Sequence, residues 1–180
     1  AATRVGADGL IEKGRENLLL QSNNFGTTWN VLNAPTITSG QSGYDGSSNA
    51  WLFESTTTAT AILNQNVSSS GVQTMSLYAK AGTADYLAFY NSSAIYVFFN
   101  LNNGSVGSSS GNIDAKIEDV GSGWYRCSMA YNASITYTRI YVADANSVFI
   151  SAIGSNIYIQ DSQLEIGLAA TDYIESGATT

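Results

Sequence analysis

The chain has 180 residues with a formal net charge of −7, and 44% of the residues are hydrophobic. This length fits a single domain with a sizeable core, and the net negative charge disfavours binding to nucleic acid. No apolar run approaches the roughly 18 to 20 residues that cross a bilayer, and the first residues lack a signal-peptide layout. We therefore expect a soluble protein without membrane insertion.

Two residue counts narrow the chemistry. Histidine is absent, which removes His-dependent catalytic triads and imidazole metal sites. Cys127 is the single cysteine and is expected to be a small buried hydrophobe, because it has no partner for an internal disulfide. The absence of histidine excludes most familiar hydrolase arrangements, and no enzymatic activity is expected.

Residues 1–16 precede any regular pattern and are interpreted as an N-terminal arm or connector. A disordered terminus is one reading of this segment. The apolar residues Val5, Leu10 and Ile11 support another, in which the arm docks onto a neighbouring subunit. Residues 17–180 are predicted to form the folded domain.

From Asn17 onward, runs rich in Val, Ile, Tyr, Phe and Thr alternate with Gly, Ser and Asn clusters about every 8 to 12 residues. This spacing predicts an all-β fold with little helix, and residues 102–112 are interpreted as a hairpin turn followed by a flexible connection. The predicted strands are 17–22, 49–55, 60–67, 73–80, 85–91, 94–101, 124–132, 138–144 and 156–166.

Alternation along these strands assigns side chains to faces, because successive residues of a strand point to opposite sides of the sheet. The sequence predicts two antiparallel sheets packed as a β-sandwich of jelly-roll type. Three sets of alternate residues are predicted to form its core: Met75, Leu77 and Ala79; Ile95, Val97, Phe99 and Leu101; Tyr125, Cys127, Met129 and Tyr131.

The segment "GSGWYRC" allows a functional and a packing interpretation. Trp124 could stack on a sugar ring, and Arg126 could bind an acidic sugar through its planar donors. Alternatively, Trp124 covers one end of the sheet and Arg126 pairs with a carboxylate such as Glu118 or Asp119. We favour packing, since large aromatic side chains in a small sandwich usually fill the core first.

A second candidate site is a set of outward-facing residues. If their strands share one sheet, they form a broad aromatic surface that could bind glycans or serve as an oligomer interface, and the interface is preferred. The set comprises Tyr78, Tyr90, Tyr96, Arg126 and Tyr141.

Several ordered segments carry a family resemblance, including "YDGSSNAWLFES", "SLYAKAG", "FFNLNNGSVG", "AKIEDVGSGWYRCSM" and "IYIQDSQLEIGLAATDYIES". Together they resemble β-sandwich domains of head spike, head fibre and tail-fibre proteins of tailed bacteriophages. They are also similar to concanavalin A-like and jelly-roll carbohydrate-binding modules. The resemblance runs from about Asn17 to Glu175.

This resemblance implies a non-catalytic structural protein on the surface of a phage virion, in the head or the tail. Its partners would be other virion proteins, a homotrimer is the assembly expected of phage fibres, and its rim could bind cell-surface glycans. The alternative is a carbohydrate-binding module of a polysaccharide-degrading enzyme. A lyase or depolymerase is the least favoured reading, because the chain has no histidine.

Two departures from the family pattern concern the C-terminal third of the chain. Gln160 and Asp161 stand where relatives commonly carry an aromatic residue and a glycine, which weakens a sugar platform there. The preceding loop is unusually hydrophobic and is predicted to contact another subunit through Val148, Phe149, Ile150 and Ile153.

No cofactor is predicted. The resemblance permits a structural Ca²⁺ near Asp161 and Glu165, beside Asn23 and Asn24, because this cation prefers oxygen ligands. No motif marks such a site.

Overall fold

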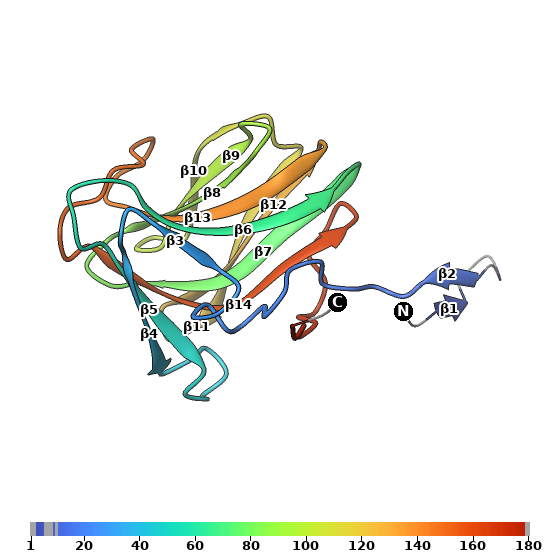
Figure 1. Cartoon of the computed structure of the whole chain (residues 1–180), viewed down its shortest axis with the longest axis horizontal. Helices are drawn as coiled ribbons and strands as arrows, with labels where there is room; N and C mark the ends of the chain where they lie inside the picture. The colour runs from blue at the N-terminus through green and yellow to red at the C-terminus, as the bar shows by residue number, and fades with distance from the viewer. Residues whose placement is uncertain (1–2, 6–8, 10, 179–180) are drawn as a thin grey trace.

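The computed structural model describes residues 3–5, 9 and 11–178. They form two six-stranded antiparallel sheets, stacked as two layers, and a small two-stranded hairpin (Figure 1). No helix in this part of the chain has the length and hydropathy needed to span a bilayer. The predicted antiparallel β-sandwich is confirmed.

The chain crosses between the two layers several times, and some consecutive strands stay in one layer. The first sheet has the order β10 (Ser105–Ser110), β9 (Tyr96–Asn100), β8 (Tyr86–Asn91), β13 (Ile135–Ala143), β6 (Ala61–Ser69) and β3 (Asn30–Leu32). The second sheet has the order β11 (Asp114–Gly121), β12 (Trp124–Asn132), β7 (Val72–Ala81), β14 (Asn156–Ile166), β5 (Ala50–Glu54) and β4 (Thr36–Gln41).

The core lies between the two sheets and follows the predicted alternation. From β7 of the second sheet come Met75, Leu77 and Ala79, and from β9 of the first come Val97 and Phe99, all completely buried. The remaining predicted core residues join the same cluster, with Tyr125 half-buried at its edge: Ile95, Leu101, Cys127, Met129 and Tyr131. The period-two reading of the sequence is therefore confirmed for these three strands.

Two predicted segments are different in the structure. Residues 17–22, predicted as a strand, contain turns and bends, because the side chain of Asn17 takes hydrogen bonds that a strand ladder would use. Residues 105–110, predicted as part of a flexible connection, form the edge strand β10. Its Ser and Gly residues show no apolar alternation because β10 covers little of the core.

The hairpin of β1 (Thr3–Val5) and β2 (Ile11–Lys13) projects away from the sandwich (Figure 1). It lies within the segment interpreted as an arm, whereas Leu10 lies outside the described residues. Docking of this arm onto a neighbour, and the boundary between residues 16 and 17, stay predictions.

Charged side chains are distributed unequally between the two sheets. The strands of the first sheet contain one charged residue, Arg139. The strands of the second sheet contain nine: Glu54, Lys80, Asp114, Lys116, Glu118, Asp119, Arg126, Asp161 and Glu165. The outer face of the first sheet therefore presents aromatic and amide groups around a single cation.

Candidate functional site

The structure divides the predicted set of outward-facing residues between the two outer faces of the sandwich. Tyr90, Tyr96 and Tyr141 lie on β8, β9 and β13 of the first sheet, whereas Tyr78 and Arg126 lie on β7 and β12 of the second. The assumption that their strands share one sheet is wrong. Alternation along a strand assigns a face but does not say which sheet the strand joins.

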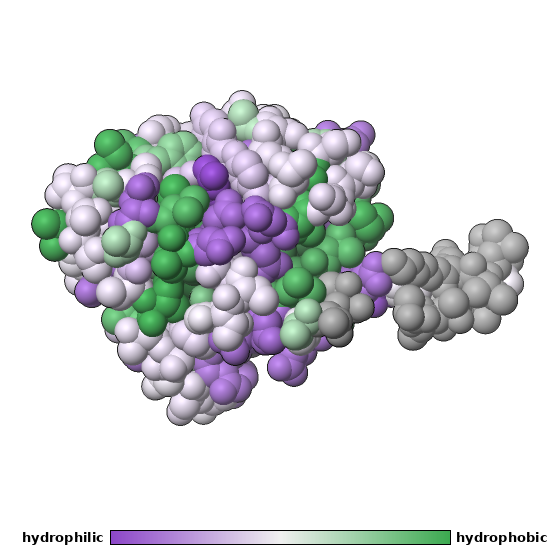
Figure 2. All heavy atoms as spheres, viewed as in Figure 1, coloured by the Kyte–Doolittle hydropathy of each residue, from purple (hydrophilic) through white to green (hydrophobic). Residues whose placement is uncertain are grey.

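On the first sheet, strand pairing brings four side chains into one row. Asn64 on β6 is opposite Arg139 on β13, Arg139 is opposite Tyr90 on β8, and Tyr90 is opposite Tyr96 on β9. We call these four residues the Arg139 row. It spans three strand spacings, or roughly 14 Å. Figure 2 shows hydrophilic side chains over the middle of β6, with hydrophobic ones to either side.

Arg139 is held in place by neighbours on its own sheet. Its guanidinium carbon lies 4.1 Å from the centre of the Tyr137 ring, within the range of a cation–π contact. Its Nε donates a hydrogen bond of 2.9 Å to Oδ1 of Asn64, and Nη1 lies 3.5 Å from the hydroxyl of Tyr141. These contacts fix the plane of the guanidinium above the sheet.

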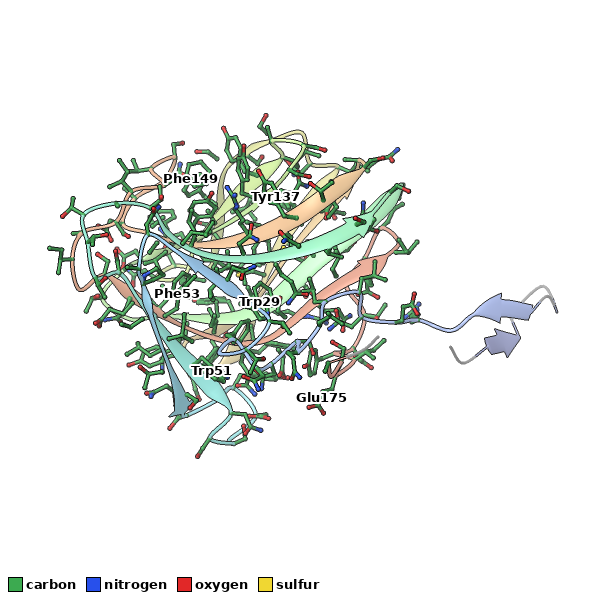
Figure 3. The ribbon with its side chains drawn as sticks, viewed as in Figure 1. Trp29, Trp51, Phe53, Tyr137, Phe149 and Glu175 are labelled. Atoms are coloured by element: carbon green, nitrogen blue, oxygen red, sulfur yellow. The ribbon has the colours of Figure 1, made fainter. Side chains whose placement is uncertain are left out.

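A second row, directly beside the Arg139 row, is covered by Phe149. Phe98 and Tyr141 belong to this row and pack against Phe149, with ring centres 4.6 and 4.9 Å away. Phe149 also contacts Tyr90 and Tyr96 edge to face, at 5.8 and 5.6 Å. Figure 3 shows Phe149 and Tyr137 on the opposite side of β13 from Phe53. Phe149 thus forms one wall of the site.

The loop between β13 and β14 carries Phe149 and is tied to the first sheet at two places. Oδ1 of Asn146 accepts hydrogen bonds from the backbone and hydroxyl of Ser108, on the edge strand β10. On the other side of β13, the backbone of Ser151 donates to Ala59, just before β6. These bonds hold Phe149 over the sheet.

The same loop contains the predicted oligomer interface. Phe149 packs on its own sheet and is half-buried there. Val148, Ile150 and Ile153 are 43, 54 and 69% exposed. Whether these three residues and the exposed part of Phe149 meet another subunit stays a prediction, as does the homotrimer.

A pocket of about 250 Å³ opens between the Arg139 row and Phe149. Its lining combines apolar ring surface with hydroxyl groups and one cation, from Thr60, Tyr90, Arg139, Tyr141 and Phe149. Such a mixture suits a hydroxyl-rich ligand with apolar ring faces, because an aromatic ring covers the ring face while polar groups bond to its rim.

The outer face of the second sheet is largely covered by the chain itself. Tyr44 stacks on Tyr78 with ring centres 3.7 Å apart and planes 7° from parallel. Arg126 lies over Tyr78 at 5.5 Å and donates from Nη2 to the carbonyl of Thr171. Trp124 is 2% exposed and packs near Tyr44, which confirms its packing interpretation. Tyr78 and Arg126 are therefore engaged within the fold.

Asp161 and Glu165, considered for calcium, have separate partners. Glu165 is buried and accepts hydrogen bonds from Gln163 and from the backbone and hydroxyl of Thr171, at 2.7 to 2.8 Å. Asp161 does lie beside Asn23, but its carboxylate accepts from the hydroxyl of Tyr44. In the described part of the chain, no three acidic, Cys or His residues could hold a metal. Both carboxylates are engaged by separate partners within the fold, and a structural Ca²⁺ near them stays a prediction.

Burial raises the pKa of Asp161 to about 6, and the nearby charges of Asp45 and Glu175 act in the same direction. Because the folded pKa exceeds the ordinary value of 3.8, this group stabilises the fold most below pH 3.8. That contribution is lost as the pH rises to 6. We expect Asp161→Asn to be more stable than wild type above pH 6 by roughly 2 kcal/mol.

Urea unfolding between pH 4 and 8 measures this difference. Asn tolerates the positive φ of 54° at position 161 and retains an acceptor for Tyr44. The exposed Asp85→Asn is the matched control and should leave the pH dependence unchanged. A wild-type curve parallel to that of Asp161→Asn would contradict the prediction.

Comparison with known proteins addresses the fold. No family model and no curated protein matches the chain. Sixteen chains of solved structures match. One is the CBM22-1 xylan-binding domain of Xyn10C from Paenibacillus barcinonensis, with 16% identity and a TM-score of 0.51, covering 88% of this chain and 99% of that one.

Another match comes from Clostridium thermocellum. It is a structure of the CBM22-1–GH10 modules of endo-1,4-β-D-xylanase 10B complexed with xylohexaose. The identity is 12% and the TM-score is 0.50, and the match covers 90% of this chain but 29% of that chain. The fold is similar to that of jelly-roll carbohydrate-binding modules. Neither structure is a phage protein, so the phage origin implied by sequence resemblance gains no support from them.

The sequence-based prediction missed three residues on the outer face of the first sheet: Asn64, Tyr137 and Arg139. The sequence did indicate Arg139 as a candidate site residue. It is two residues from Tyr141 on the same strand and is the single charged residue in a long uncharged run. Asn64 gave no such signal. It becomes a site residue because β6 pairs with β13 in this register.

Proposed function

We propose that this chain is a non-catalytic carbohydrate-binding domain whose ligand lies along the Arg139 row. The observation that carries the proposal is the row itself, in which half-buried Tyr90 and Tyr96 continue a line of hydrogen-bonding groups from Asn64 and Arg139. Tyrosine rings supply apolar faces at a small entropic cost, and the amide and guanidinium supply directional bonds.

Several observations favour binding over catalysis. The strands of the first sheet carry no Asp or Glu, so they offer no pair of carboxylates for glycoside cleavage. The chain has no histidine to act as a general base. Both solved structures described above contain a CBM22-1 module, one named as xylan-binding and one in complex with xylohexaose. A virion role rests on the sequence resemblance by itself.

Affinity electrophoresis in gels containing xylan, mixed-linkage glucan or mannan tests the proposal. We expect retardation by at least one polysaccharide, and a loss of about ten-fold or more in affinity when Tyr90 or Tyr96 is replaced by alanine. Tyr158→Ala is the matched control, because Tyr158 is a half-buried tyrosine on the outer face of the second sheet.

The outcomes separate the two faces of the sandwich. Retention of binding in both Tyr90→Ala and Tyr96→Ala, with loss in Tyr158→Ala, would move the site to the second sheet. Turnover of any of these polysaccharides by the purified chain would overturn the non-catalytic assignment.

A further inference from the structure

Arg139 is a cation without an anionic partner in a site that otherwise lacks charge. No carboxylate lies on any strand of its sheet, and its neighbours in the row are an amide and two tyrosines. Within the described residues, no ion pair involves Arg139. The chain as a whole has an excess of acidic residues, so the isolation of this arginine is a local feature.

The guanidinium is nevertheless fixed in orientation. Tyr137 supports one face at 4.1 Å, and Nε is bonded to Asn64 at 2.9 Å. A guanidinium carries five N–H donors, and the weaker contact to Tyr141 engages one more of them. Three donors on Nη1 and Nη2 are left without a partner in the described part of the chain. They form the open end of a planar fork.

A glycan lying over the row would cover Arg139 and remove water from these free donors. A neutral hydroxyl compensates poorly for the lost hydration of a cation, whereas an anionic group does so through charge-assisted bonds. A carboxylate also matches the planar fork through two parallel N–H···O bonds. The aromatic walls strengthen this pairing because they lower the local dielectric.

We infer that the ligand of the Arg139 row is an acidic glycan containing uronic acid residues, one of whose carboxylates binds end-on to Nη1 and Nη2 of Arg139. This inference rests on the proposed carbohydrate-binding function and names the substrate class of that site. Tyr90 and Tyr96 lie on one side of Arg139 in the row, where they then cover the sugar rings next to the charged residue.

Isothermal titration with oligogalacturonates and glucuronoxylan oligosaccharides, each compared with its methyl ester, tests the inference. Esterification removes the charge and leaves the sugar ring unchanged. We expect the acid to bind about ten-fold or more tightly than the ester, with the ratio falling as salt is raised. Arg139→Gln should reduce the ratio to about one, and Arg139→Lys should retain part of it.

Lys80→Gln is the matched control, since it removes one positive charge from the other sheet and should leave the acid-to-ester ratio unchanged. Circular dichroism of each variant verifies folding. Equal binding of acid and ester by wild type would overturn the inference while leaving the proposed function intact. Equal binding of sulfated and uronate glycans would overturn the assignment to carboxylate, and failure to bind any glycan would overturn both proposals.

Discussion

Replacing Asn17 with alanine is expected to lower the free energy of unfolding by about 4 kcal/mol, because one buried amide satisfies four backbone groups. Its Nδ2 donates to the carbonyls of Ser162 and Ile174 at 2.9 and 3.0 Å. Its Oδ1 accepts from the backbone of Leu19 and Leu164 at 3.1 and 3.0 Å. The side chain thus joins the first ordered segment of the sandwich to β14 and to the C-terminal segment.

Chemical denaturation monitored by tryptophan fluorescence measures the effect of Asn17→Ala. Asn102→Ala is the control, because Asn102 is exposed and its side chain has no hydrogen bond within the described residues. Asn17→Asp keeps the acceptor but replaces the two donors with a charge facing two carbonyls, so it should be at least as destabilising as alanine. A loss below about 1 kcal/mol in Asn17→Ala would show that water replaces the amide.

The second large effect is expected for Phe99→Ala, at about 3 to 5 kcal/mol. Phe99 is completely buried between the sheets and meets Phe89 edge to face at 5.2 Å. Removing its ring leaves a cavity that the surrounding strands cannot close without breaking their pairing. The measurement is again the free energy of unfolding in urea.

Phe149→Ala removes the same atoms from the outer face and should cost less than half as much, because Phe149 is half-buried on a loop that can close over the gap. The same variant widens the pocket beside Tyr90, so it should also weaken glycan binding. If Phe149→Ala proved as destabilising as Phe99→Ala, the outer aromatic cluster would be a second core and not the wall of a site.

The candidate site was predictable in part. Alternation along β8, β9 and β13 placed Tyr90, Tyr96 and Tyr141 on outer faces, and the structure brings these three together. It separates them from Tyr78 and Arg126, because β7 and β12 pair with each other in the second sheet. Strand pairing joins segments that are far apart in the sequence. The periodicity within one strand does not predict which other strand it pairs with.

Local pattern therefore determined the all-β class, the buried positions of Leu77, Val97 and Met129, and the scarcity of helix, since each depends on neighbours within one strand. Tertiary structure decided which outer face remains open. Hydrogen bonds between distant segments hold Phe149 over the first sheet and the C-terminal residues over the second, and the register of β6 against β13 sets Asn64 beside Arg139. These interactions stabilise the protein only after the sheets have formed. No single segment of the sequence therefore predicts them.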